Sequence, residues 1–129
     1  MGTAKSNPLL ESSDLPFSVP NFKLFTPERV REAYMELLKL ERKAFADLTA
    51  RRASYKNTIL GLEQVSDDYH CVHAAFFLLS AVHGTPETRK LETELTQRFM
   101  RQYNRIFQDP VLFEKVSKVF NRRARLDPM

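Results

Sequence analysis

Residues 69–83 read YHCVHAAFFLLSAVH, and this apolar stretch decides the expected fold. It continues a stripe of apolar residues with spacings of three and four, namely Leu62, Val65, Tyr69, Val72, Phe76 and Leu79. Such spacing is typical of one face of an α-helix. Beyond Tyr69 the opposite face becomes apolar too, and a helix that is apolar on all sides is typically buried on all sides. We therefore expect residues 71–82 to run through the middle of an all-α core.

The composition is that of a soluble globular protein with one domain. The chain has 129 residues, of which 43% are hydrophobic and 28% charged, and its formal net charge is +4. Basic and acidic residues alternate along the expected helices, which is typical of solvated surfaces, so we expect no nucleic-acid partner. The twelve residues 71–82 are too few for a membrane span, which needs about 20 residues.

Cysteine content and the chain start bear on the compartment. The single cysteine excludes an internal disulfide, and the first thirty residues lack the apolar segment of a secretory signal. We therefore expect a cytoplasmic protein. Gly2 and Ser6 fit the N-myristoylation pattern, but this pattern is short and one acyl chain anchors only weakly. We favour an unmodified Gly2.

Residues 1–25 are expected to form an extended, proline-rich arm. Pro8, Pro16 and Pro20 occur here with Ser, Asn and Asp between them, a composition that disfavours regular structure. The arm is nevertheless too apolar for a free tail, since it contains Leu9, Leu10, Leu15, Phe17, Val19, Phe22, Leu24 and Phe25. We expect it to lie along the helical domain and to bury part of this set.

Residues 26–125 are expected to form a four-helix up-down bundle, followed by a tail at residues 126–129. The helices are predicted to begin with caps at Thr26, Ser54, Thr85 and Asp109. Proline follows three of these caps directly, which is typical of a helix start. The second helix is expected to run to His83, and Gly61 within it indicates a close contact with another helix. Short connections between the helices favour the up-down order.

All three histidines lie on the second predicted helix, which raises the question of a metal site. Asp67 and His70 resemble half of the paired motif of di-metal helical bundles, but no other helix carries a histidine to complete it. His70 and His83 are thirteen residues apart, or about 20 Å along a helix axis. We therefore expect His70, His73 and His83 to be hydrogen-bonded core or rim residues and predict no metal ligand.

No catalytic constellation is predicted either. Cys71 adjoins His70, but neighbours in sequence do not face each other on a helix, so we expect an inert, small apolar residue. The sequence lacks a glycine-rich phosphate loop, a Gly-x-Ser-x-Gly elbow and a His-Glu-x-x-His motif. Arg122, Arg123 and Arg125 could contact phosphate, but we favour a solvated helix end. We predict no catalytic, cofactor-binding or metal-binding residue in this chain.

Four stretches of the sequence, taken in order, carry a family resemblance. Residues 7–10 read NPLL, residues 22–30 read FKLFTPERV, residues 57–63 read NTILGLE and residues 82–89 read VHGTPETR. Together they resemble the N-terminal helical region of the thimet oligopeptidase family, in which the third stretch is similar to a helix start and the fourth to the turn that comes after it. The resemblance is strongest to the oligopeptidase A and peptidyl-dipeptidase branch of these zinc metallopeptidases. Arg29 departs from the pattern, because the family often has histidine there.

The resemblance implies a non-catalytic portion that forms part of one wall of a substrate channel. The parent family hydrolyses short peptides with zinc, held by a His-Glu-x-x-His motif and a later glutamate in another part of a much longer chain. Zinc and hydrolysis therefore carry over to no residue here. The resemblance implies a natural truncation, a split-gene product or a fragment.

The expected partner is the remainder of the peptidase, or a second copy in a homodimer. Six apolar residues fall beside the inward stripes and suggest surfaces for such a partner: Leu38, Leu40, Phe77, Leu78, Met100 and Phe107. Short peptides would be bound only in the full-length context. The alternative is a stand-alone helical interaction module without an enzymatic parent.

Overall fold

The computed structural model describes residues 7–65 and 67–123, and for residues 67–70 it describes the backbone only. In this part of the chain every regular element is helical, which confirms the all-α class. The α-helices described are α1 Pro27–Ala50, α2 Gly61–Val65, α3 Asp67–His83, α4 Pro86–Phe107 and α5 Pro110–Asn121. Three 3-10 turns, η1 Pro8–Leu10, η2 Pro16–Ser18 and η3 Phe22–Leu24, precede them, and a π-helix, η4 Tyr55–Leu60, precedes α2. The predictions for Gly2 and for the tail at 126–129 lie outside the described residues.

The predicted helix starts are confirmed, because each is fixed by local sequence. The side chains of Thr26 and Asp109 accept hydrogen bonds from the backbone amide three residues on, at 3.4 and 2.9 Å. Thr85 and Thr88 form a reciprocal capping box, in which each hydroxyl accepts from the other's amide, at 3.1 and 2.7 Å. In all three cases proline occupies the first helical turn, where its missing N–H costs nothing.

The second predicted helix is not one regular helix. Ser54 caps its start as expected, but residues 55–60 form a π-helical turn, in which the Gly61 amide donates to the Lys56 carbonyl five residues back. Gly61 also lies against α1: a Cβ atom there would be 3.2 Å from Leu48 Cδ1. This proximity confirms the close contact predicted at Gly61.

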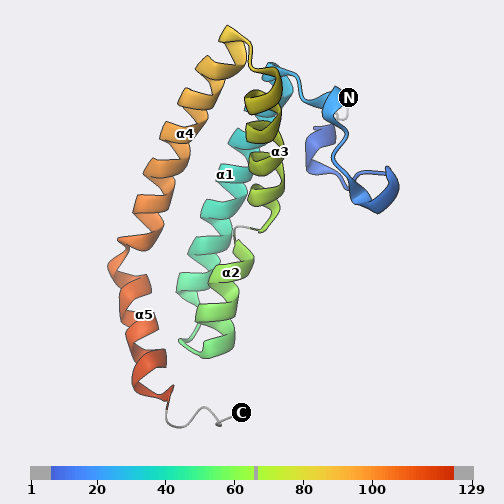
Figure 1. Cartoon of the computed structure of the whole chain (residues 1–129). Coiled ribbons are helices and arrows are strands. Elements are labelled where there is room, and N and C mark those ends of the chain that lie inside the picture. Colours follow the sequence, from blue (N-terminus) through green and yellow to red (C-terminus); the bar gives the residue numbers. More distant parts are fainter. Residues whose placement is uncertain (1–6, 66, 124–129) are drawn as a thin grey trace, which may run out of the picture.

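The expected up-down order of four helices is not confirmed. α1 and α3 lie side by side, α4 returns along them, and α5 then continues in the direction of α4 (Figure 1). Gln108 and Asp109 separate α4 from α5. α5 packs instead against η4 and the end of α1.

Two apolar clusters form the core. The larger lies between α1, α3 and α4 and contains Val30, Ala33, Tyr34, Leu37, Leu38, Val72, Phe76, Leu91 and Leu95. The smaller joins the other ends of α1 and α4 to α5 and contains Leu48, Ile106 and Leu112. Phe76 is 1% exposed, so the inward stripe predicted through it is correct.

The prediction that residues 71–82 are buried on all sides is wrong. Leu78 is 57% exposed and Val82 is 69% exposed, and Cys71 is exposed as well. The physical reason is the number of neighbours: α1, α4, α2 and η1 contact α3 and leave one of its faces uncovered in the described structure. None of the described helices combines the length and apolarity needed to cross a membrane.

The arm is compact where an extended segment was expected. It turns three times, at η1, η2 and η3, beside α3 (Figure 1). The Asn7 side-chain amide donates to the Arg29 carbonyl at 2.8 Å and so ties the arm to the first turn of α1. Leu9, Leu10 and Phe25 pack against the larger core cluster, whereas the tip of the arm around Phe17 is exposed.

Candidate functional site

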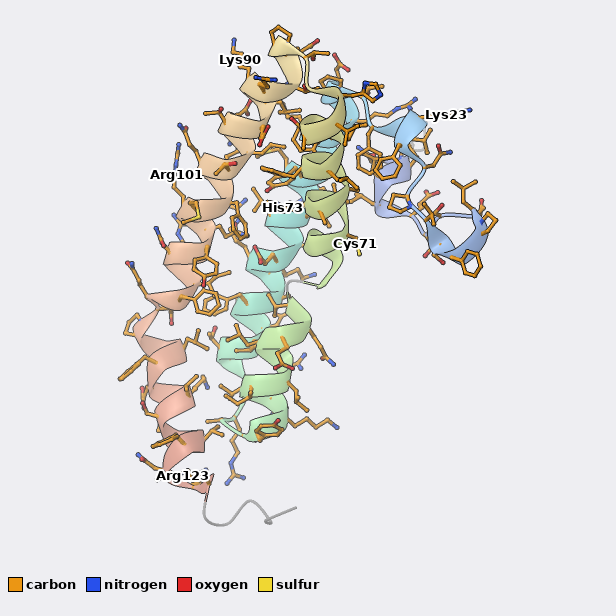
Figure 2. The ribbon with its side chains drawn as sticks, in the orientation of Figure 1. Lys23, Cys71, His73, Lys90, Arg101 and Arg123 are labelled. Atoms are coloured by element: carbon orange, nitrogen blue, oxygen red, sulfur yellow. The ribbon has the colours of Figure 1, made fainter. Side chains whose placement is uncertain are left out.

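His73 lies in an aromatic cluster between α1, α3 and α4. Its Nδ1 atom is 2.8 Å from the Tyr34 hydroxyl, and its ring stacks on Phe77 with centroids 4.2 Å apart. The centroid of the Phe99 ring, on α4, lies 5.4 Å from that of His73. Figure 2 shows His73 pointing into the space between the helices. These contacts describe a hydrogen-bonded residue of the helix interface, as the sequence predicts.

Two of the three histidines, His73 and His83, have side chains that the structure describes, and these lie apart. His83 lies exposed at the C-terminal end of α3, while His73 lies inside the bundle. The side chains of His70 and Asp67 lie outside the described residues. Among the side chains that are described, no group of three or more metal-ligating residues occurs.

Burial raises the pKa of Tyr34. This side chain is fully buried, and desolvation raises the pKa of its phenol above the ordinary value of 10.0, with a second, smaller effect from the Glu41 charge. The phenol therefore stays neutral to a higher pH than an exposed tyrosine.

Glu41 and Gln102 form a buried polar contact between α1 and α4 that sequence reasoning missed. They are 6% and 8% exposed. The Gln102 side-chain amide donates to the Leu38 carbonyl at 3.0 Å and also to the Glu41 carboxylate. Their positions in the sequence could have indicated this, because each occurs at the helical spacing of the apolar residues that face inward on its helix. Buried and mutually satisfied, these groups fix how α4 sits on α1.

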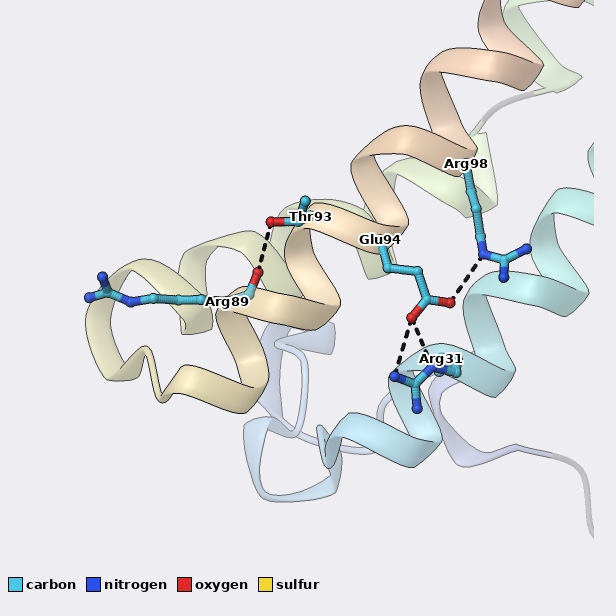
Figure 3. Close-up of polar contacts among 5 residues, drawn as sticks. All are labelled: Arg31, Arg89, Thr93, Glu94 and Arg98. Carbon is cyan, nitrogen blue, oxygen red and sulfur yellow. Dashed lines mark hydrogen bonds and ion pairs between the residues drawn. The ribbon is translucent and has the colours of Figure 1, made fainter.

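An ion cluster joins the same two helices at the surface. The Arg31 Nε and Nη2 atoms lie 3.3 Å from Glu94 Oε2, and the Arg98 Nε atom lies 3.2 Å from Glu94 Oε1 (Figure 3). The three side chains are between a third and a half exposed, so solvent screens the pairing. Thr93 donates to the Arg89 carbonyl at 3.1 Å, a bond within α4 (Figure 3). This cluster links α1 and α4 at the surface.

Cys71 and the basic residues at the end of α5 are both exposed. Cys71 lies at the edge of a groove beside the arm, which corrects the apolar burial expected for it. The Arg123 guanidinium lies 3.9 Å above the Phe120 ring and donates to the Phe120 carbonyl at 3.0 Å. Arg122 is exposed beside it, and Arg125 lies outside the described residues.

This groove is a cavity of about 590 Å³ between the arm, α1 and α3. Further exposed apolar side chains lie on three helices: Leu78 and Val82 on α3, Met100 and Phe107 on α4, and Phe113 and Phe120 on α5. Of the six residues predicted beside the stripes, Leu38 is buried and Phe77 partly buried, while Leu40, Leu78, Met100 and Phe107 are exposed.

Comparison with known proteins points to peptidases. No protein-family model matches the chain. It is 30% identical over 122 residues to the dipeptidyl carboxypeptidase of Escherichia coli strain K12, and 28% identical over 123 residues to that of Salmonella typhimurium strain LT2. These matches cover 93% and 94% of this chain but 18% of each relative, so the chain spans about a fifth of their length. The similarity supports the peptidase relationship implied by the sequence motifs, without locating the chain in a particular region of these enzymes.

Proposed function

We propose that this chain is the N-terminal, non-catalytic helical portion of a zinc-dependent oligopeptidase-like protein. The observation that carries the proposal is the similarity to dipeptidyl carboxypeptidases over 93% of this chain and 18% of the relative. On this proposal the zinc ion and the groups that hydrolyse short peptides belong to the remainder of the parent protein. We further propose that the protein is cytoplasmic.

Within the parent protein, the helices contribute to one wall of a substrate channel. Support comes from the uncovered apolar side chains of α3 and α4, because Leu78, Val82, Met100 and Phe107 are each close to half exposed or more. Exposed apolar residues on adjoining helices are typical of a surface that packs against another part of a protein. The proposed partner of this surface is the remainder of the peptidase.

The test is a pair of assays on the isolated chain. We expect no zinc to remain after dialysis and no cleavage of a short fluorogenic peptide, with the Escherichia coli relative as the positive control. Stoichiometric zinc, or cleavage that a chelator abolishes, would show that the chain is itself catalytic and would refute the proposal.

The second candidate is a stand-alone helical interaction module. It is favoured by the same exposed apolar side chains, which serve equally well to bind a separate protein. The two candidates differ in the sequence that the messenger RNA encodes beyond residue 129, and both predict an isolated chain without hydrolytic activity.

A further inference from the structure

The groove beside the arm has a lining of apolar and polar residues, and its charged members are acidic. Its apolar residues include Leu37 and Leu40 of α1, Val72 of α3, and Leu9, Leu10 and Phe25 of the arm, and three serines and Asn21 also line it. Glu11 and Asp14 are its charged lining residues, and both are acidic. Neither forms an ion pair among the described residues. Figure 2 shows Cys71, at the groove's edge, on the side of α3 that faces the arm. The groove therefore suits an apolar segment that carries positive charge.

The loop that borders this groove is strained and presents an aromatic ring to solvent. Phe17 and Ser18 have left-handed backbone conformations, with φ of 60° and 55°, which residues other than glycine rarely adopt. Ser13 closes the loop, since its hydroxyl donates to the Val19 carbonyl at 2.6 Å and accepts from the Leu15 amide at 3.2 Å. Phe17 is 100% exposed, so no contact within the described chain offsets the strain. Strained residues of this kind cluster at binding sites.

α5 carries a surface that complements the groove. Phe113 and Phe120 are 74% and 59% exposed, and their spacing of seven residues places them on one side of the helix. Arg122 and Arg123 come next at the helix end, and Arg123 stacks on Phe120. Their charges also face the negative end of the helix dipole. This end of the molecule is thus aromatic and positively charged.

α5 cannot reach the groove of its own chain. The arm lies beside α3, whereas α5 lies at the far end of the bundle, packed on η4, α1 and α4 (Figure 1). A second copy can supply α5 instead. With twofold symmetry, the α5 helix of each copy lies in the groove of the other, which gives two identical contacts and a closed dimer.

We propose that the groove binds α5 of a second copy of this chain. Phe113 and Phe120 enter the groove between the arm and α1, Arg122 and Arg123 lie against Glu11 and Asp14, and Phe17 covers the helix. Both partner surfaces lie within this chain, so the proposal stands independently of the relationship to peptidases.

Charge reversal tests the pairing. The variant Glu11→Lys/Asp14→Lys and the variant Arg122→Glu/Arg123→Glu each turn both contacts of the dimer from attraction to repulsion. We expect each to weaken self-association by at least about tenfold in sedimentation experiments across a concentration series at low salt. The control Asp47→Lys/Glu63→Lys makes the same change of charge at exposed positions away from the groove, and should associate like the original chain.

The decisive measurement uses a mixture of the two charge-reversed variants. In a heterodimer of the two reversed variants, both contacts join opposite charges again, so an equimolar mixture should recover the original association. Recovery excludes misfolding as the cause of the loss. An original chain that stays monomeric, reversed variants that associate normally, or a mixture that fails to recover would each overturn the proposal.

The variant Phe17→Gly distinguishes an effect on self-association from an effect on folding. Glycine removes the left-handed strain, so the denaturation midpoint should stay the same or rise. Loss of the ring should weaken self-association several-fold, as expected for an aromatic residue at an interface. Unchanged association would contradict the role proposed for Phe17.

Discussion

Phe76 is the residue on which the larger core cluster most directly depends. It is 1% exposed, between α1 and α4. Phe76→Ala would remove this buried side chain and leave a cavity, and we expect it to lower the free energy of unfolding by about 3–5 kcal/mol. The measurement is urea denaturation of the purified variant.

Leu78→Ala is the matched control on the same helix. Because Leu78 is 57% exposed, its truncation should change the free energy of unfolding by about 0.5 kcal/mol or less. Equal losses in the two variants would show that the inward face of α3 is assigned incorrectly.

The raised pKa of Tyr34 should make the free energy of unfolding depend on pH. Burial raises the pKa of its phenol, so the folded state favours the neutral form. The stabilisation of the folded protein by the neutral Tyr34 phenol is therefore fully present below the ordinary pKa of 10.0. It is lost as the pH rises above that value. Between about pH 10 and pH 11.5, Tyr34→Phe should lose less stability than the original chain, as measured by urea denaturation at each pH.

The control for this experiment lies near pH 7. There Tyr34→Phe should be less stable than the original chain by about 1–3 kcal/mol, because it loses the hydrogen bond to His73 Nδ1. Parallel pH profiles of the two proteins above pH 10 would mean that Tyr34 titrates as an exposed phenol.

At the scale of the elements, other atoms lie close to the backbone at two glycines, Gly84 between α3 and α4 and Gly61 at the start of α2. A Cβ atom at Gly84 would lie 2.5 Å from the Ser80 carbonyl oxygen, so the backbone between α3 and α4 would have to move. Gly84→Ala should therefore destabilise the protein by about 1–3 kcal/mol. Thermal denaturation measures the effect.

Gly61→Ala is the comparison for Gly84→Ala. Its Cβ would meet the end of the Leu48 side chain at 3.2 Å, which can shift by a small rotation. The gain in helix propensity, about 1 kcal/mol, offsets this contact. Gly61→Ala should thus be clearly milder than Gly84→Ala, and the reverse order would argue against the packing described at the two turns.

Local signals predicted the helix starts, and non-local packing decided what could not be predicted. Thr26, Thr85 and Asp109 act within their own first turn, so their neighbours in sequence suffice to identify them. The direction of α5 and the exposed side of α3 depend on which helices lie nearby. The apolar pattern of a sequence does not show how many helices pack around a given helix. For this reason the prediction that α3 is buried on all sides was wrong.

The candidate site was predicted less completely than the helices. The spacing of the histidines correctly favoured a hydrogen-bonded role for His73. The groove could not be predicted, because it arises where the arm turns back beside α1 and α3. Phe113 and Phe120 are exposed although they adjoin the buried Leu112 and Val119, so the apolar pattern of α5 alone does not show which of its side chains are covered.

At the scale of the whole molecule, the chain combines a well-packed interior with uncovered apolar surfaces. The arm, α1, α3 and α4 build the larger core cluster, and a buried Glu41–Gln102 contact fixes α4 on α1. In contrast, side chains such as Val82 and Phe113 are 69% and 74% exposed. A helical portion of a longer protein is expected to show this combination, because part of its surface packs against the remainder.

Sequencing the messenger RNA beyond the codon for Met129 tests the proposed parentage most directly. The proposal predicts that the reading frame continues, or that a separate gene supplies the remainder, and that the continuation encodes a His-Glu-x-x-His motif and a later glutamate. A continuation that encodes neither this motif nor the later glutamate would contradict the proposal and favour the stand-alone interaction module.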